Sequence, residues 1–213
     1  KNTDQSHMET FYTTYDEIKS QKFDGMIITG APVEFLNFDD VDYWDELSVL
    51  MDYTKKNVFS TLHVCWGAQA GLYHHYGIRK YELPEKLFGV FPHRINDRTS
   101  EFTRGFDDVF YVPHSRHTQI RKEDILNQPD LEILAESEEA GPHIICSKNK
   151  RMLLIQGHME YDRDTLRLEY ERDLSRGLPI KVPANYFKND DPGQGIQIRW
   201  TGHANLFFAN WLN

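Results

Sequence analysis

The sequence has little of what marks a membrane protein, a nucleic-acid-binding protein or a disulfide scaffold. It holds only two cysteines, Cys65 and Cys146, and neither lies in a C-x-x-C or a Cys/His zinc spacing. No apolar run approaches the roughly 20 residues that span a bilayer. Lys and Arg number 24 against 33 for Asp and Glu, and the net charge of -9 disfavours nucleic acid and anionic membranes as partners. We therefore expect a cytoplasmic protein with reduced thiols.

What the chain does contain is an alternation of short apolar runs with longer stretches of helical periodicity. The apolar runs predict strands at 25–30, 58–64, 109–112, 131–135, 144–146 and 152–156. The periodic stretches predict helices at 11–19, 41–53, 67–76, 164–175 and 203–212. Strands that alternate with helices predict an α/β fold, with a mostly parallel sheet flanked by helices on both faces. No linker or repeat divides the chain, so 1–213 is expected to form a single domain.

Cys65 stands where the strand predicted at 58–64 meets the helix predicted at 67–76. This is the position of a nucleophile elbow, where the first amides of the helix favour a thiolate. The amide of Trp66 is a candidate donor to an oxyanion. His63, two residues earlier, departs from the small residue usual in such elbows. The alternative interpretation is a buried, inert cysteine.

A base for Cys65 is offered by His158, which follows the strand predicted at 152–156. Glu160 lies two residues further on, and residues two apart on an extended segment share a face. Glu160 would then orient the imidazole, which would take a proton from the thiol and later from an acceptor hydroxyl. Sequence spacing alone leaves open whether residues 65 and 158 meet, and nine other histidines compete with His158.

Five motifs, in this order, resemble those of the homoserine O-succinyltransferase/O-acetyltransferase family. They are Thr29-Gly-Ala-Pro32, His63-Val-Cys-Trp-Gly-Ala-Gln-Ala-Gly71, Pro113-His-Ser-Arg-His117, Gly157-His-Met-Glu-Tyr161 and Asn210-Trp-Leu-Asn213. The resemblance runs along essentially the whole chain. Members of that family are longer at the N-terminus, and this chain opens on Lys1 without a methionine. We therefore expect that an N-terminal segment is missing from it.

The resemblance implies a fold similar to class I glutamine amidotransferases and a homodimeric enzyme of methionine biosynthesis. It implies a ping-pong reaction in which acyl-CoA acylates Cys65 and the hydroxyl of homoserine then attacks the thioester. His158 would be the proton acceptor and Glu160 its partner. The family's substrate-binding lysine, serine and arginine fall on Lys86, Ser115 and Arg172. No metal or cofactor besides the acyl-CoA is implied. For Arg172, the competing interpretation is a salt bridge within its own charged helix.

The choice of acyl group is predicted from Glu34, which follows Thr-Gly-Ala-Pro-Val. Family members with glycine at this point resemble succinyltransferases, and members with glutamate resemble acetyltransferases. A glutamate in the acyl pocket would repel the terminal carboxylate of a succinyl group and fill its space, whereas acetyl is short and neutral. We therefore expect acetyl-CoA as the donor, with succinyl-CoA as the alternative.

Two other classes of function stay open at this point. A glutamine amidotransferase or cysteine hydrolase would use the same three residues but release its acyl group to ammonia or water. A binding domain with a decayed site would need no catalytic residues, and the intact set argues against it. Four histidines, His74, His75, His114 and His117, raise the question of a metal, but no further ligand lies at a motif spacing, and none is expected.

Overall fold

The computed structural model describes residues 12–213. Its strands are β1 (Phe23–Ile28), β2 (Val58–Val64), β3 (Tyr81–Ile95), β4 (Val109–Gln119), β5 (Leu131–Ser137), β6 (Gly141–Ser147) and β7 (Met152–Ile155). Its α-helices are α2 (Tyr15–Ile18), α3 (Trp44–Asn57), α4 (Trp66–Tyr76), α5 (Lys122–Leu126), α6 (Thr165–Ser175) and α7 (Thr201–Leu212). Short 3-10 turns lie at Phe38–Asp40, Glu101–Thr103, Lys188–Asp190 and Pro192–Gln194.

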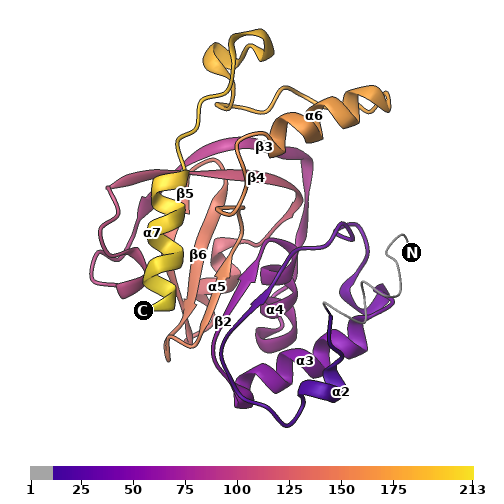
Figure 1. Cartoon of the computed structure of the whole chain (residues 1–213), viewed down its shortest axis with the longest axis vertical. Helices are drawn as coiled ribbons and strands as arrows, with labels where there is room; N and C mark the ends of the chain where they lie inside the picture. The colour runs from indigo at the N-terminus through magenta and orange to yellow at the C-terminus, as the bar shows by residue number, and fades with distance from the viewer. Residues whose placement is uncertain (1–11) are drawn as a thin grey trace.

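The seven described strands form one sheet in the order β1-β2-β7-β6-β5-β3-β4 (Figure 1). Only β1–β2 and β2–β7 pair in parallel, and the other four neighbouring pairs are antiparallel. The α/β class is confirmed, but the expectation of a mostly parallel sheet is wrong for the described strands. The reason is that β5, β6 and β7 follow one another with connections of only three and four residues, which suit antiparallel neighbours, and that residues 96–108 join β3 to β4 without an α-helix.

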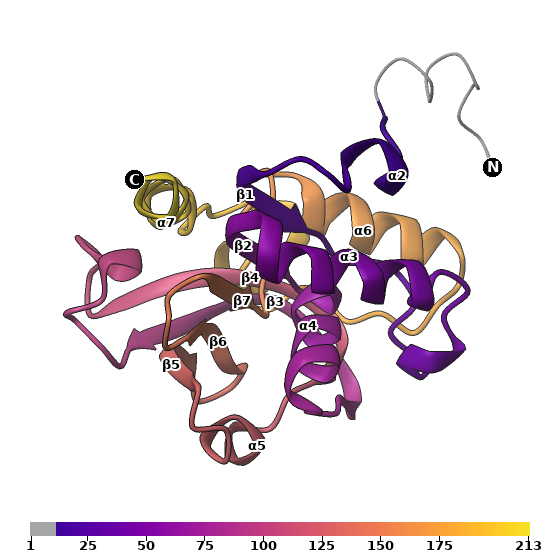
Figure 2. The ribbon, with the colours of Figure 1, turned by 90° about the horizontal axis from the view of Figure 1, so that it is seen from below.

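Helices cover both faces of the sheet, as predicted (Figure 2). Leu153 and Ile155 of β7 pack in one apolar cluster with Phe207 of α7. Met152 and Leu154, the alternate residues of the same strand, pack with α4 and α5 in a second cluster. This period of two explains the continuous apolar run of β7, because a strand buried on both faces has no polar side.

The longest strand, β3, is one that the sequence pattern did not predict. Pro84, Gly89 and Pro92 interrupt its apolar residues, and its pairing with β4 shifts register between Glu82 and Leu87. β4 is also longer than the predicted 109–112, and it carries polar residues to Gln119. The short helix α5 was not predicted either. α6 and the segment after it lie over β3 and β4 (Figure 1), where Leu166, Tyr186 and Trp200 pack on Phe88 and Val90.

The remaining predicted elements are present with shifted ends. The helices predicted at 41–53, 67–76, 164–175 and 203–212 correspond to α3, α4, α6 and α7. The helix predicted at 11–19 is reduced to α2, and Phe11 lies outside the described residues. Among residues 12–213, no helix combines the length and the apolar character needed to cross a bilayer.

Candidate active site

The turn from β2 into α4 holds Cys65 in a strained backbone conformation. Its φ of 53° and ψ of -117° are rare for a residue with a side chain. The backbone amide of Cys65 donates to the carbonyl of Ile155 at 2.8 Å, and its own carbonyl accepts from Ala68 at 3.0 Å. These bonds fasten the turn to β7 on one side and to α4 on the other. The expected elbow geometry is therefore present, with the thiol at the N-terminus of α4.

His63, which departs from the usual elbow pattern, is accommodated by a glycine one turn into α4. Its ring is fully buried, and Nδ1 lies 3.2 Å from the carbonyl oxygen of Gly67. A Cβ on Gly71 would lie 2.7 Å from that nitrogen, so only glycine leaves room for the imidazole. Burial lowers the pKa of His63 to about 4, and the ring stays neutral.

The structure brings His158 to Cys65 because β2 and β7 are neighbours in the sheet. Their parallel register pairs Val64 with Ile155, so the residues that follow each strand leave the sheet together. The segment after Ile155 is a turn and not the extended segment that was predicted. Within the turn, His158 Nδ1 still lies 2.6 Å from Glu160 Oε1, since the turn folds Glu160 back onto the ring.

Three further contacts fix the imidazole of His158. Its backbone amide donates to the carbonyl of Pro113 at 2.8 Å. Its ring stacks on Tyr161 with the centroids 4.2 Å apart. The preceding Gly157 lies so close to β4 that an added Cβ would meet Val112 Cγ1 at 2.5 Å and His114 Nε2 at 2.7 Å. The base is therefore positioned by backbone and ring packing as well as by Glu160.

The electrostatics of the site favour an imidazolium. Burial lowers the pKa of His158, but hydrogen bonds to Cys65 and to Glu160 outweigh that effect and raise the pKa to about 10. An imidazolium beside Cys65 stabilises a thiolate. The other cysteine differs, because burial raises the pKa of Cys146 to about 12 and its sulfur donates to the carbonyl of Ser147. Only Cys65 has the surroundings of a nucleophile.

The first amides of α4, beginning with Trp66, have no partner inside the helix, and they lie at its positive end. Trp66 directly follows the nucleophile, which is where an oxyanion donor of an elbow is expected. Its indole is buried among Phe38 and Tyr43. This geometry suits the predicted oxyanion role of the Trp66 amide.

Lys86, Ser115 and Arg172 come from β3, β4 and α6, and all three meet at one carboxylate. Lys86 Nζ lies 2.6 Å and Ser115 Oγ 2.8 Å from Oε1 of Glu169, and Arg172 Nη2 lies 3.5 Å from the same oxygen. Glu169 was missed by sequence reasoning. Its only signal is that it lies four residues before Asp173 on α6, which is common on any charged helix.

Arg172 also makes the intrahelical pairs that were its competing interpretation. Its Nε and Nη2 both lie 2.7 Å from Asp173 Oδ1. Lys86 reaches the other oxygen of Asp173 at 3.6 Å. The Arg172 side chain is 48% exposed, whereas that of Asp173 is only 8% exposed. Arg172 therefore stands at the rim of this charged group, and the ion pairs and hydrogen bonds of its guanidinium within residues 12–213 involve Nε and Nη2.

Glu34 lies in the loop between β1 and α3, and its charge acts on residues around Cys65. Burial raises the pKa of Tyr161, and the charges of Glu169, Cys65, Glu160 and Glu34 raise it further. Glu34 likewise opposes the lowering of the His117 pKa by burial. The ring of Phe35 packs against His117 at 4.8 Å. The charge of Glu34 thus acts on Tyr161 and His117, as the charge of Glu169 does.

The four histidines considered as metal ligands do not form one group. His74 and His75 lie beside Asp52, while buried His114 groups with His93 and His143. In the buried group, His114 Nε2 lies 3.2 Å from His93 Nε2, His143 Nδ1 accepts from the amide of Gly157, and the guanidinium of Arg116 donates to His114 Nδ1. A metal ion here would face the charge of Arg116, so the group is better explained as packing beneath His158.

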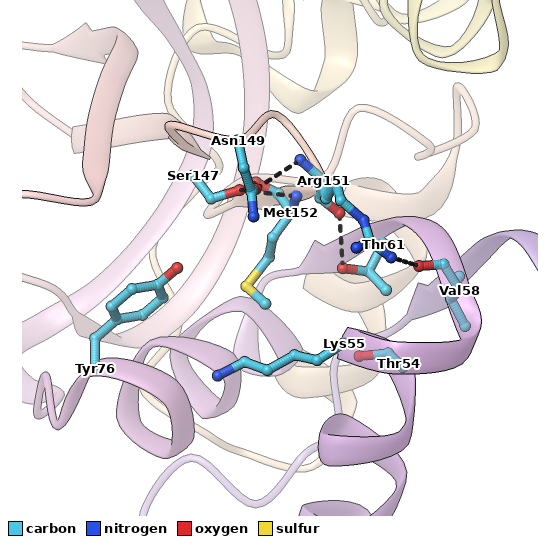
Figure 3. A pocket seen from close by; sticks show the side chains of 9 residues that line it. All are labelled: Thr54, Lys55, Val58, Thr61, Tyr76, Ser147, Asn149, Arg151 and Met152. Atoms are coloured by element: carbon cyan, nitrogen blue, oxygen red, sulfur yellow. Dashed lines mark hydrogen bonds between the residues drawn. The ribbon is translucent and has the colours of Figure 1, made fainter.

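A hollow at the opposite end of β2 lacks such chemistry (Figure 3). It is lined by Thr54, Lys55, Val58, Thr61, Tyr76, Ser147, Asn149, Arg151 and Met152. Arg151 donates to the carbonyls of Val58 and Phe59, so its guanidinium is bonded to the backbone of β2. In α/β sheets the ligands bind beyond the carboxyl ends of parallel strands, which is where Cys65 and His158 lie.

A family model and several relatives match the chain along its whole length. The family model described as homoserine O-succinyltransferase matches residues 1–213. The homoserine O-acetyltransferase of Clostridium acetobutylicum is 60% identical over all of this chain and 71% of the relative. The enzymes of the same name from Geobacillus kaustophilus and Acetivibrio thermocellus are 58% and 57% identical, again over all of this chain and 70% of each relative.

Solved structures support the fold. A glutamine amidotransferase from Methylobacillus flagellatus superposes with a TM-score of 0.62 at 14% identity, over 89% of this chain and 76% of that one. One from Thermotoga maritima gives 0.59 at 14% identity, over 87% and 73%. The expected likeness to glutamine amidotransferases is confirmed at the level of the fold. The family model and the relatives, which match the chain along its whole length, show that it belongs to the homoserine O-succinyltransferase family.

Proposed function

We propose that this chain is a homoserine O-acetyltransferase, which moves an acetyl group from acetyl-CoA to the hydroxyl of homoserine through a thioester on Cys65. The observation that carries the proposal is the group of Cys65, His158 and Glu160 at the end of β2 and β7, in a member of this family. The relatives' printed name supports acetyl as the group transferred. The proposal also holds that the enzyme works in the cytoplasm, in methionine biosynthesis, as a homodimer without a metal or further cofactor.

The first half-reaction uses the thiolate of Cys65 and the imidazolium of His158. The sulfur attacks the thioester carbonyl of acetyl-CoA, and the amide of Trp66 stabilises the oxyanion that forms. The bond between the carbonyl carbon and the CoA sulfur breaks. His158 Nε2, the nitrogen not bonded to Glu160, gives its proton to the departing CoA thiolate. The enzyme is then an acetyl-thioester with a neutral His158.

The second half-reaction reverses the proton's direction. Neutral His158 takes the proton of the homoserine hydroxyl as its oxygen attacks the acetyl carbonyl. The carbon–sulfur bond to Cys65 breaks, and the thiolate and imidazolium are restored. Glu160 stabilises the charged ring in this step, as a carboxylate does for the histidine of a serine-protease triad.

Homoserine recognition follows from the charged group on α6. Homoserine carries an ammonium and a carboxylate, and the group offers partners for both. Glu169, 17% exposed and surrounded by donors, would take the ammonium. Lys86 and the Nη1 of Arg172 would take the carboxylate, since a guanidinium matches a carboxylate in shape and charge. The hydroxyl of Ser115 donates to Glu169 and would fix the position of the Glu169 carboxylate.

The acyl choice rests on Glu34. Its charge acts on Tyr161 and His117, which supports a position where a succinyl carboxylate would meet a like charge. The alternative is that the chain transfers a succinyl group, because the matching family model is described as homoserine O-succinyltransferase. The test is the ratio of kcat/KM for acetyl-CoA and succinyl-CoA, with homoserine saturating.

We expect acetyl-CoA to be preferred on the order of a thousandfold, since like charges in a poorly solvated pocket cost several kcal/mol. Release of CoA without homoserine, and ping-pong kinetics with it, are the accompanying results. A preference for succinyl-CoA would contradict the acetyl assignment. Hydrolysis of glutamine with no need for an acyl-CoA would contradict the acyltransferase itself and favour the amidotransferase alternative.

A further inference from the structure

The loop that carries Glu34 is held by a lysine from another part of the chain. Lys80 lies after α4, just before β3 begins. Its ammonium donates to the backbone carbonyl of Glu34 and, at 2.6 Å, to the carbonyl of Leu36. Among the hydrogen bonds of residues 12–213, the bond from Lys80 is the only one made to Glu34. One side chain therefore fixes the backbone of the residue expected to select the acyl group.

Lys80 is half-buried, although lysine is mostly an exposed type of residue. Lys80 has left solvent in part, and burial lowers its pKa while the charges of Glu34 and Glu82 oppose that change. Its ammonium also lies 5.2 Å from the ring centroid of Phe38. Charge-assisted bonds to two carbonyls and a cation–π contact all go to one loop, 34–38. The contacts that replace water around the Lys80 ammonium are therefore made with this loop.

The rest of the loop is anchored on its other side. Phe38 stacks on Tyr73 of α4 at 4.7 Å, and the hydroxyl of Tyr73 donates to Asp39 at 2.9 Å. These contacts hold residues 38 and 39. At the other end Val33 packs against an apolar cluster that includes Trp44, and Phe35 packs on His117, but the bond from Lys80 holds the backbone carbonyl of Glu34 itself. Loss of Lys80 would therefore release the carbonyls of Glu34 and Leu36, while the contacts of Phe38 and Asp39 with Tyr73 would remain.

We propose that Lys80 is a specificity-positioning residue, which clamps the 34–38 loop so that the Glu34 carboxylate stays in the acyl site. The inference rests on the proposed function, in which Glu34 rejects the succinyl carboxylate. Repulsion between two carboxylates falls as their distance grows and as water enters between them. If the loop could move outward by a few ångströms, the enzyme would therefore accept succinyl-CoA. The kcat/KM for acetyl-CoA would change little, because the acetyl group is neutral.

The experiment measures kcat/KM for acetyl-CoA and for succinyl-CoA in wild type, Lys80→Met, Lys80→Arg, Arg79→Met and Glu34→Gly. Arg79→Met is the matched control, because it removes the same charge from the neighbouring exposed residue. We expect Lys80→Met to lower the acetyl-to-succinyl ratio by about tenfold or more, with kcat for acetyl-CoA close to wild type. Lys80→Arg should restore part of the ratio, and Arg79→Met should leave it unchanged.

The two possible failures can be told apart. If Glu34→Gly collapses the ratio but Lys80→Met keeps it within about twofold, the clamp is wrong and the role of Glu34 stands. If Glu34→Gly itself leaves the ratio unchanged, the acyl selection by Glu34 is wrong and the clamp falls with it. Should Lys80→Met fail to fold, Lys80→Gln gives the same neutral end with a shorter, polar side chain, and the same ratio decides.

Discussion

The catalytic half and the recognition half of this site are held in different ways. The backbone amides of Cys65 and His158 donate to the carbonyls of Ile155 and Pro113, and both residues follow the ends of two buried neighbouring strands. Lys86 and Arg172 are fixed by ion pairs with Glu169 and Asp173, and the Arg172 side chain is 48% exposed. Backbone bonds hold atoms in one place, whereas ion pairs can be exchanged for a ligand of the same charge. The difference suits a nucleophile that must not move and a substrate that must come and go.

The largest expected effect comes from removing the base. His158→Asn should lower kcat by roughly a hundred- to ten-thousandfold, since the variant removes the imidazole that interacts with Cys65 and moves the proton. Glu160→Gln should retain more activity, because it loses only the stabilisation of the charged ring. Steady-state kinetics of the two variants provide the measurement. Wild-type turnover in His158→Asn would mean that another of the ten histidines is the base.

Next in size is Glu169→Gln, which tests the recognition half alone. The variant leaves Lys86, Ser115 and Arg172 without their shared carboxylate, and it removes the proposed partner of the homoserine ammonium. We expect KM for homoserine to rise by tenfold or more, up to about a hundredfold, with CoA release from acetyl-CoA unchanged. Glu171→Gln, on the exposed side of the same helix, is the matched control. Equal losses in both half-reactions would show that Glu169 supports the fold instead.

A pH experiment sharpens the comparison from the catalytic side. The fold raises the pKa of His158 from 6.5 to about 10, so the protonated ring adds stability that is fully present below pH 6.5. That contribution is lost as the pH rises through about 10. Urea unfolding of wild type and of His158→Asn should therefore differ less at about pH 10.5 than at neutral pH. A constant difference would show that the ring is neutral in the resting enzyme.

The smallest expected effect is that of Arg172→Ala. The side chain is half exposed and already paired with Asp173, so its loss should raise KM for homoserine by only about tenfold. Acylation by acetyl-CoA should be spared, as measured by CoA release without homoserine. A matching fall in acylation would place Arg172 in the support of α6, which is the salt-bridge interpretation of its helix.

The elbow at Cys65 and the pair of His158 with Glu160 could be predicted because each lies within a few residues of sequence. Their meeting could not be derived from spacing, since it depends on β2 and β7 becoming neighbours across four intervening strands. β3 was not predicted because prolines and a glycine interrupt its apolar residues. Its antiparallel pairings with β4 and β5 make the sheet less parallel than expected. The role of Glu169 was not predicted because the sequence of a charged helix does not show which of its acidic residues will contact Lys86 and Ser115.

The central claim is that Cys65 carries the acyl group, and the intact mass of the protein tests it most directly. After incubation with acetyl-CoA and without homoserine, the wild-type chain should gain the mass of one acetyl group. Peptide mapping should place that group on Cys65, and addition of homoserine should remove it. Cys65→Ser should show no exchangeable adduct, whereas Cys146→Ser should behave as wild type. An adduct that persists in Cys65→Ser, or that maps to Cys146, would contradict the account.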